Sequence, residues 1–117
     1  MLLDLGLPLD TAPTADPAPL MPDVPVLREL EAGPLALVLS HDHADHWGLA
    51  PHARPSLPVL TGAATRCILL AAAPFVPHAV SLAAQGSELP DLSDRVPLRV
   101  GPFTVTPHLV DHSAFDA

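Results

Sequence analysis

The sequence predicts a small α/β or α+β domain, in which short strands alternate with one or two helices. Its 117 residues are 49% hydrophobic and 15% charged, which is typical of a chain that folds around one core and not of a disordered tail or a coiled coil. Sixteen prolines are spread through the chain and divide it into short elements. One continuous apolar run, residues 35–39, has the length and composition of a strand buried on both faces.

The first half of the chain is expected to hold two strands and a short helix. Residues 2–5 form an apolar run that ends at Gly6, which indicates a strand entering a turn. Residues 8–25 are rich in Pro, Asp, Thr and Ala without periodicity, so they are expected to form a loop. Residues 26–32 are expected to form two helical turns, and the buried-type strand at 35–39 follows them.

The second half is expected to hold a short strand, a helix and two further strands. Residues 58–60 indicate the short strand, and Thr61 is expected to cap a helix of good helix formers that runs through residue 73. Residues 96–100 and 103–110 are expected to be two strands joined by a turn at Gly101 and Pro102. Pro107 places the second of these at an edge or at a bulge, because proline cannot donate a ladder hydrogen bond.

Charge, cysteine content and hydropathy exclude several classes of protein. Thirteen acidic and five basic residues give a net charge of −8, which argues against a surface that coats nucleic acid. The single cysteine, Cys67, excludes an intramolecular disulfide and a cysteine-based zinc knuckle, and it is expected to be a small core residue of the helix. The longest apolar run, residues 67–76, has about half the length that a bilayer needs, and no signal peptide is recognisable. We therefore expect a cytoplasmic location and no membrane partner.

A cluster of histidines and aspartates follows the buried-type strand directly, in the sequence SHDHADHWG at 40–48. Alternate side chains of an extended chain point the same way, so His41 and His43 can converge on one metal ion. After the chain turns at Ala44, Asp45 and His46 are placed for a second ion. Imidazole and carboxylate suit zinc, and two ions about 3.5–4 Å apart can hold a hydroxide between them. The competing interpretations are a solvated loop and an incidental metal-affinity patch.

A second cluster near the end of the sequence offers a third ligand for the first ion. A catalytic zinc site uses three protein ligands with water in the fourth position, and His112 is the candidate that completes the set. Asp111 is either a carboxylate that orients an imidazole or a surface group. The remaining histidines are interpreted as exposed or loop residues and not as ligands: His52, His78 and His108.

The histidine motif resembles the signature of the metallo-β-lactamase superfamily of metallohydrolases. That motif is His41-x-His43-x-Asp45-His46, and it lies directly after the buried-type strand. Weaker flanking pieces make the arrangement most similar to the ribonuclease J group: LDLG at 3–6, MPD at 21–23, GLAP at 48–51, and GPFTV at 101–105 leading into His112 and Ser113.

The resemblance implies a fold, a ligand set and a reaction. The fold would be a truncated αββα metallo-β-lactamase sandwich over residues 1–117. The family's upstream hairpin and its downstream half, which carries a bridging Asp and a last His ligand, are expected to be missing from it. His41, His43 and His112 would bind one zinc ion, and Asp45 and His46 the second. Asp45 would also be catalytic by orienting the nucleophile.

The function implied is a zinc-dependent hydrolase that cleaves RNA phosphodiesters by metal-bound hydroxide. One alternative is a small-molecule ester, thioester or phosphodiester hydrolase of the same fold. Another is a catalytically incomplete metal-binding fragment.

Overall fold

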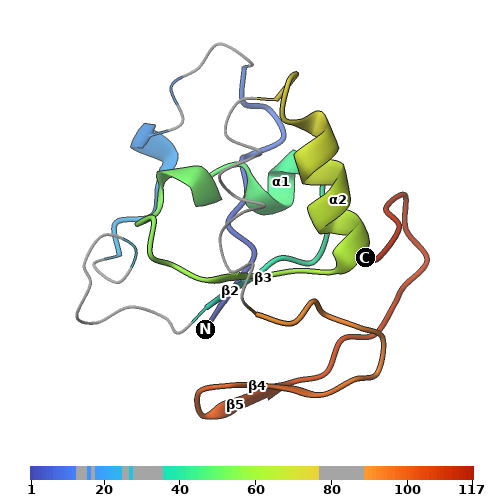
Figure 1. Ribbon diagram of the computed structural model, residues 1–117. Helices are drawn as coiled ribbons and strands as arrows, with labels where there is room; N and C mark the ends of the chain where they lie inside the picture. Colours follow the sequence, from blue (N-terminus) through green and yellow to red (C-terminus); the bar gives the residue numbers. More distant parts are fainter. Residues whose placement is uncertain (13–15, 17, 25–26, 28–35, 77–88) are drawn as a thin grey trace.

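A three-stranded parallel sheet forms the centre of the protein (Figure 1). The structure is a computed structural model that describes residues 1–12, 16, 18–24, 27, 36–76 and 89–117. The strands lie in the order β1-β2-β3, with Leu2 opposite Leu37 and Leu37 opposite Val59. Their bounds are β1 Leu2–Leu3, β2 Leu37–Val38 and β3 Val59–Leu60. Strands are thus confirmed inside the apolar runs at 2–5, 35–39 and 58–60, each of them shorter than the run.

The middle strand is buried on both faces, as its continuous apolar sequence predicts. Leu37 and Leu39 have no exposed surface and point into a cluster that contains Trp47 and Leu69 from the helices. Val38 points the other way, into a second cluster that includes Leu60 and Val100. Alternation along β2 therefore divides the apolar side chains between two cores, one on each face of the sheet.

Helices cover the first face. They are the short α1, Ala44–Trp47, and the longer α2, Ala63–Ala72, with 3-10 turns η1 at Ala18–Leu20 and η3 at Ala50–His52. The residue that caps α2 is Gly62 and not Thr61, and a glycine has no side chain to make a capping bond. Cys67 is exposed, contrary to the core position expected for it. The reason is that α2 buries one narrow stripe, Thr65 and Leu69, which lie four residues apart, and residue 67 falls on the opposite side.

A hairpin covers the second face. Strands β4, Leu98–Val100, and β5, Phe103–Val105, pair antiparallel through a turn in which Gly101 has a φ of 59°. Val100 is the buried residue of this hairpin and packs with Val38 and Leu60. The prediction of a strand over 103–110 is wrong beyond Val105, because the chain leaves the hairpin before Pro107 and forms neither helix nor strand from there on.

The coarse fold class is therefore an α+β domain with few helices and short strands. The helix predicted at 26–32 falls, apart from Leu27, outside the described residues, and so does His78. The predicted loop at 8–25 holds only the turn η1 in its described part. Within the described part of the chain, no helix has the length and hydropathy needed to span a lipid bilayer.

Candidate metal centre

The histidine cluster lies where β1 and β2 end. In a sheet of parallel strands the carboxyl ends meet at one edge, which is where α/β folds commonly place ligands. The chain passes from β2 through Ser40 to His41, which is 3% exposed, and then to His43, the residue before the first turn of α1. Asp4 follows β1 at the same edge, and its backbone takes a φ of 53°, which aspartate tolerates better than most residues.

The N-terminal segment holds α1 in place through its backbone. Leu5 donates a hydrogen bond to the carbonyl of His46 at 2.8 Å, and its own carbonyl accepts one from Leu49 at 3.0 Å. Gly6 packs against the carbonyl of Asp45 so closely that a Cβ at this position would collide with it. The glycine therefore lets the segment after β1 approach the short helix that carries Asp45 and His46.

Three imidazole nitrogens converge at this edge. His41 Nε2 lies 3.0 Å from His43 Nδ1 and 3.1 Å from His112 Nε2, although His41 and His112 are 71 positions apart in the sequence. One ring nitrogen from each of the three residues lies within 4.8 Å of the other two. Nitrogens bound at 2.0–2.1 Å to one tetrahedral zinc ion would lie about 3.3 Å apart, so the observed spacing is close to that of a ligand set.

The convergence cannot be satisfied by hydrogen bonds alone. A ring nitrogen of a neutral imidazole carries either one proton or one lone pair. His41 Nε2 therefore cannot form a full hydrogen bond to His43 and another to His112 at the same time. A cation placed between the three nitrogens would satisfy all of their lone pairs. The three histidines could hold a metal ion, and the donor set fits zinc among other divalent metals.

The neighbours of His41 fix which of its nitrogens faces the cluster. Asp4 is a carboxylate, so Ser40 donates its hydroxyl proton to Asp4 Oδ2 at 2.9 Å. The serine oxygen can then only accept from His41 Nδ1, at 3.0 Å. This network places the ring proton of His41 on Nδ1 and leaves a lone pair on Nε2, the tautomer that a metal needs.

His46 is oriented by the same carboxylate. Its Nδ1 lies 2.8 Å from Asp4 Oδ2 and 3.0 Å from the Ser40 hydroxyl, so Nδ1 carries the proton. The lone pair is then on Nε2, the ring nitrogen that lies 3.6 Å from Asp45 Oδ2. Asp45 and His46 are thus adjacent to each other, and the ring of His46 lies 3.9 Å from that of His41, centre to centre.

The structure brings together three of the five ligands predicted from the sequence around one point: His41, His43 and His112. Asp45 and His46 form a pair beside them. No other His, Cys, Asp or Glu among the described residues joins this pair in a group that could hold an ion. The second metal ion therefore stays a prediction. Asp111 and His108 are exposed.

Two residues of the centre, Asp4 and Ser40, are not among the ligands that the histidine motif predicts. Asp4 also accepts a hydrogen bond from the backbone N–H of Ser40, at 2.8 Å. A signal for both was present in the sequence, since each is a polar residue directly after a strand-like run. Polar residues in that position on two parallel strands lie at the same edge of the sheet.

The electrostatic environment favours neutral His41. Burial lowers its pKa below the ordinary value of 6.5, and the nearby rings of His46, His43 and His112 lower it further, while Asp4 acts in the opposite direction. A neutral imidazole is the form that binds a metal ion. The cluster thus keeps its central ligand ready for binding at neutral pH.

The lowered pKa predicts how the stability of the metal-free protein depends on pH. Below pH 6.5 the unfolded chain takes up a proton at His41 more readily than the folded chain does. Above pH 6.5, His41 is neutral in both states and does not affect the free energy of unfolding. As the pH drops from 6.5 toward the lowered pKa, the free energy of unfolding is expected to fall. Across this pH window, the melting temperature should fall less steeply with decreasing pH in His41→Gln than in the unmodified chain. An equal slope in both proteins would contradict the prediction.

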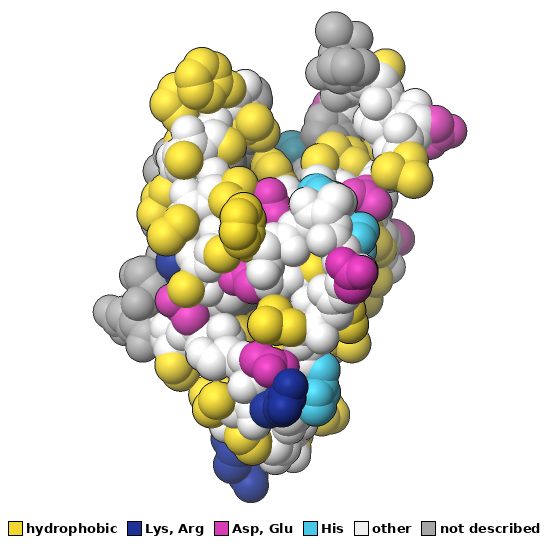
Figure 2. Space-filling view, turned by 90° about the vertical axis from the view of Figure 1, so that its right-hand side faces the viewer, with side chains coloured by type: hydrophobic (Ala, Val, Ile, Leu, Met, Phe, Trp, Pro, Cys, Tyr) yellow, Lys and Arg dark blue, Asp and Glu magenta, His cyan; other side chains and the backbone are white. Residues whose placement is uncertain are grey.

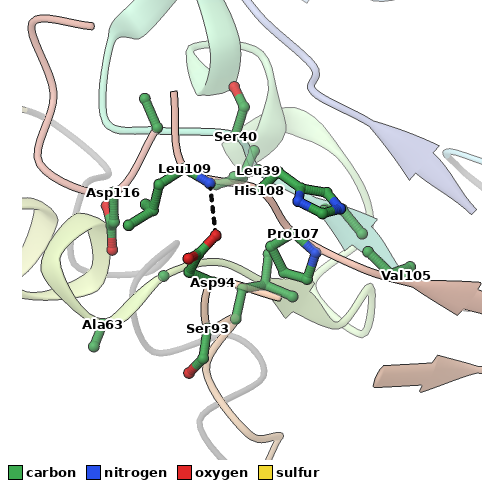
Figure 3. Close-up of a pocket in the computed structure, with 14 residues that line it drawn as sticks. Leu39, Ser40, Ala63, Ser93, Asp94, Val105, Pro107, His108, Leu109 and Asp116 are labelled. Atoms are coloured by element: carbon green, nitrogen blue, oxygen red, sulfur yellow. Dashed lines mark hydrogen bonds between the residues drawn. The ribbon is translucent and has the colours of Figure 1, made fainter. Parts of the chain in front are cut away.

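A pocket of about 440 Å³ adjoins the metal centre at Ser40 (Figure 3). It lies between the end of β2, the start of α2 and the segment that follows β5. Its walls are mostly apolar, from Val38, Leu92, Val105 and Leu109, and Asp94 and His108 add polar groups.

The fold and the site together define a small α+β domain with a three-histidine cluster that could hold a metal ion. No family model matches the sequence, and comparisons with curated proteins and with solved structures gave no match.

Proposed function

We propose that this chain binds zinc through His41, His43 and His112 and is a hydrolase of the metallo-β-lactamase type. The observation that carries the proposal is the convergence of three ring nitrogens within 4.8 Å of one another. The orientation of His41 by the Asp4–Ser40 pair supports it, because metal-binding histidines usually donate their other ring proton to such a partner. The spacing of the histidine motif supports the assignment to the metallo-β-lactamase superfamily. In that assignment the sheet and its helices belong to an αββα sandwich.

The residues of the centre have separate roles in this proposal. The three imidazoles hold the ion, and a bound zinc ion would supply the Lewis acidity that activates water and stabilises developing negative charge. Asp4 and Ser40 hold the ring protons of His41 and His46 on Nδ1. This leaves the lone pair of His41 on the nitrogen that faces the cluster and the lone pair of His46 on the nitrogen beside Asp45. Asp45 and His46 are the proposed ligands of a second zinc ion, and the Asp45 carboxylate is the proposed group that orients the attacking water.

The reaction that we favour is the cleavage of RNA phosphodiesters, which rests on the similarity to the ribonuclease J group. The net charge of −8 opposes the approach of a polyanion, and two zinc ions would reduce it only to −4 (−8 plus twice +2). On the face shown in Figure 2, acidic side chains and histidines lie among apolar ones, and basic side chains lie mainly toward the lower end. RNA would therefore need phosphate-binding groups other than these.

A second candidate is a hydrolase of a small ester, thioester or phosphodiester. It is favoured by the mostly apolar pocket beside Ser40, whose volume of about 440 Å³ is in the range of small-molecule sites. An uncharged or singly charged substrate also avoids the repulsion that a polyanion would meet.

Removal and return of the metal tests the hydrolase proposal. The protein is stripped with a chelator, dialysed and reloaded with zinc, and bound zinc per chain is measured together with the cleavage of RNA and of chromogenic phosphodiesters and esters. We expect hydrolysis to be lost on stripping and restored by zinc, with two zinc ions per chain in the active form. One tightly bound ion without hydrolysis of any of these substrates would instead support a catalytically incomplete metal-binding chain.

A further inference from the structure

The third ligand of the cluster lies on a segment without regular secondary structure. Strand β5 ends at Val105, and residues 106–117 form neither helix nor strand, while His112 itself is exposed. Holding one side chain at a fixed point from such a segment requires that its backbone be restrained, because an unrestrained loop has many conformations to lose on binding. The hydrogen bonds of this segment therefore decide whether His112 is in place before a metal arrives.

The near side of the segment is attached to the turn before β4. The carbonyl of Pro107 accepts a hydrogen bond from the backbone N–H of Arg95 at 2.8 Å, and the backbone N–H of Leu109 donates one to Asp94 Oδ1 at 3.1 Å. Figure 3 shows this second bond across the pocket. These two bonds fix the chain up to residue 109, three residues before His112.

The far side of the segment is attached to the first turn of α2 by the Asp116 carboxylate. It accepts hydrogen bonds from the N–H of Ala64 at 2.8 Å, from the N–H of Thr65 at 3.0 Å and from the Thr65 hydroxyl at 2.6 Å. Thr65 and Asp116 lie 51 positions apart in the sequence. Gly62 makes this approach possible, since a Cβ there would collide with the carboxylate. The C-terminus accordingly lies beside the start of α2 (Figure 1).

The position of Asp116 suits a carboxylate. The first N–H groups of a helix have no partner inside it, and the helix dipole favours a negative charge there. Gly62, which caps α2, has no side chain to fill that role. A further bond from the N–H of Val110 to the carbonyl of Ala117, at 3.0 Å, closes the chain around His112 into a small loop. Asp116 therefore attaches this closed loop, with its histidine, to the helix.

We infer that Asp116 is a positioning residue of the metal centre, which holds His112 within reach of His41 and His43. The inference rests on the proposed zinc site and adds a residue that touches neither the ion nor a ligand ring. Without the attachment of Asp116 to α2, the far side of the loop keeps only the long contact of the Ser113 hydroxyl with His43 Nε2, at 3.5 Å, and the ring of His112 is no longer firmly held beside His41. The metal would then be held by the His41–His43 pair.

The test compares the coordination of Co²⁺, a coloured substitute for zinc, in the full chain and in Asp116→Asn. This change keeps the shape of the side chain but replaces one acceptor by an N–H₂ group that faces the helix N–H donors. We expect the affinity to fall at least about 10-fold, toward that of His112→Ala, because the third ligand is no longer held beside the other two. We also expect the visible spectrum to change to that of His112→Ala. In the double variant, Asp116→Asn should cause no loss beyond that of His112→Ala alone.

Asp111→Asn is the matched control, because it removes the same charge from an exposed carboxylate next to His112 in the sequence. If Asp111→Asn and Asp116→Asn lose the same amount of Co²⁺ affinity, the loss is explained by the removed charge alone and the inference is overturned. Additive losses in the double variant would overturn it as well, since they indicate a general destabilisation. If Asp116→Asn does not fold, Thr65→Val, which removes the 2.6 Å hydroxyl contact, decides by the same criteria.

The failure of this inference can be told apart from the failure of the proposed function. If the unmodified chain binds neither Co²⁺ nor zinc, the metal centre itself is refuted and the positioning role with it. If the unmodified chain and Asp116→Asn both bind Co²⁺ with a three-imidazole spectrum and equal affinity, the metal centre stands and the inference is overturned.

Discussion

Replacing His112 by alanine is expected to weaken zinc binding by more than about 100-fold, since even neighbours of metal ligands cost about 10- to 100-fold when changed. The physical reason is that His41 and His43 alone leave the ion with two protein ligands, whereas catalytic zinc sites use three. Hydrolysis should be lost in the same variant. Zinc retained after dialysis and the turnover of the zinc-loaded protein are the two measurements.

His108→Ala is the control for this variant. It removes a histidine from the same segment, four positions before His112, and His108 is exposed and outside the three-histidine cluster. Its zinc content should equal that of the unmodified chain, and zinc content alone is compared, because His108 lines the pocket beside Ser40. If His112→Ala keeps both zinc and turnover, the assignment of the third ligand is wrong.

The second large effect is expected from Asp4→Asn. An asparagine of the same shape would present an N–H₂ group to the Ser40 hydroxyl and to His46 Nδ1, where the carboxylate Oδ2 now accepts. Ser40 would then accept from residue 4 and donate to His41, which moves the ring proton of His41 onto Nε2. That nitrogen faces the metal, so zinc affinity should fall about 10- to 100-fold.

Zinc titration of Asp4→Asn should be compared with that of Asp10→Asn, which removes one negative charge from an exposed position near the same terminus. NMR of the ring nitrogens of the metal-free protein offers a direct readout of the tautomer. We expect His41 to carry its proton on Nδ1 in the unmodified chain and on Nε2 in the variant. Equal zinc affinities of the two asparagine variants would refute the role of Asp4.

The elements that the sequence predicts best are those with a strong local pattern. Residues 35–39 are apolar without interruption, and β2 is buried on both faces because only a central strand of a covered sheet can accommodate such a run. The helix formers after residue 62 give α2 almost at its predicted length. His41 and His43 are two residues apart in extended chain, and their rings meet as that spacing requires.

What the sequence does not predict depends on contacts between distant segments. The partner of the first turn of α2 is Asp116, and no local pattern marks a residue 51 positions away as a capping group. The exposure of Cys67 follows from which stripe of α2 meets the sheet, which composition alone does not specify. The sequence predicts a strand up to residue 110, shortly before His112, but His112 lies in a loop closed by tertiary hydrogen bonds.

The role of Asp4 is intermediate between these cases. Its place after a strand-like run was visible, but its contact with Ser40 and His46 required the parallel order of β1 and β2. Once that order is known, two polar residues that end neighbouring parallel strands are expected to meet. Topology, and not the motif, therefore supplies the residue that orients the ligands.

X-ray absorption spectroscopy of the protein loaded with one zinc ion per chain tests the three-histidine centre most directly. We predict three imidazole nitrogens at about 2.0–2.1 Å from the ion, with an oxygen completing a four-coordinate shell. His112→Ala should reduce the imidazole count to two. A zinc ion surrounded by oxygen alone, or by the same number of imidazoles with and without His112, would contradict the assignment of His41, His43 and His112 as one ligand set.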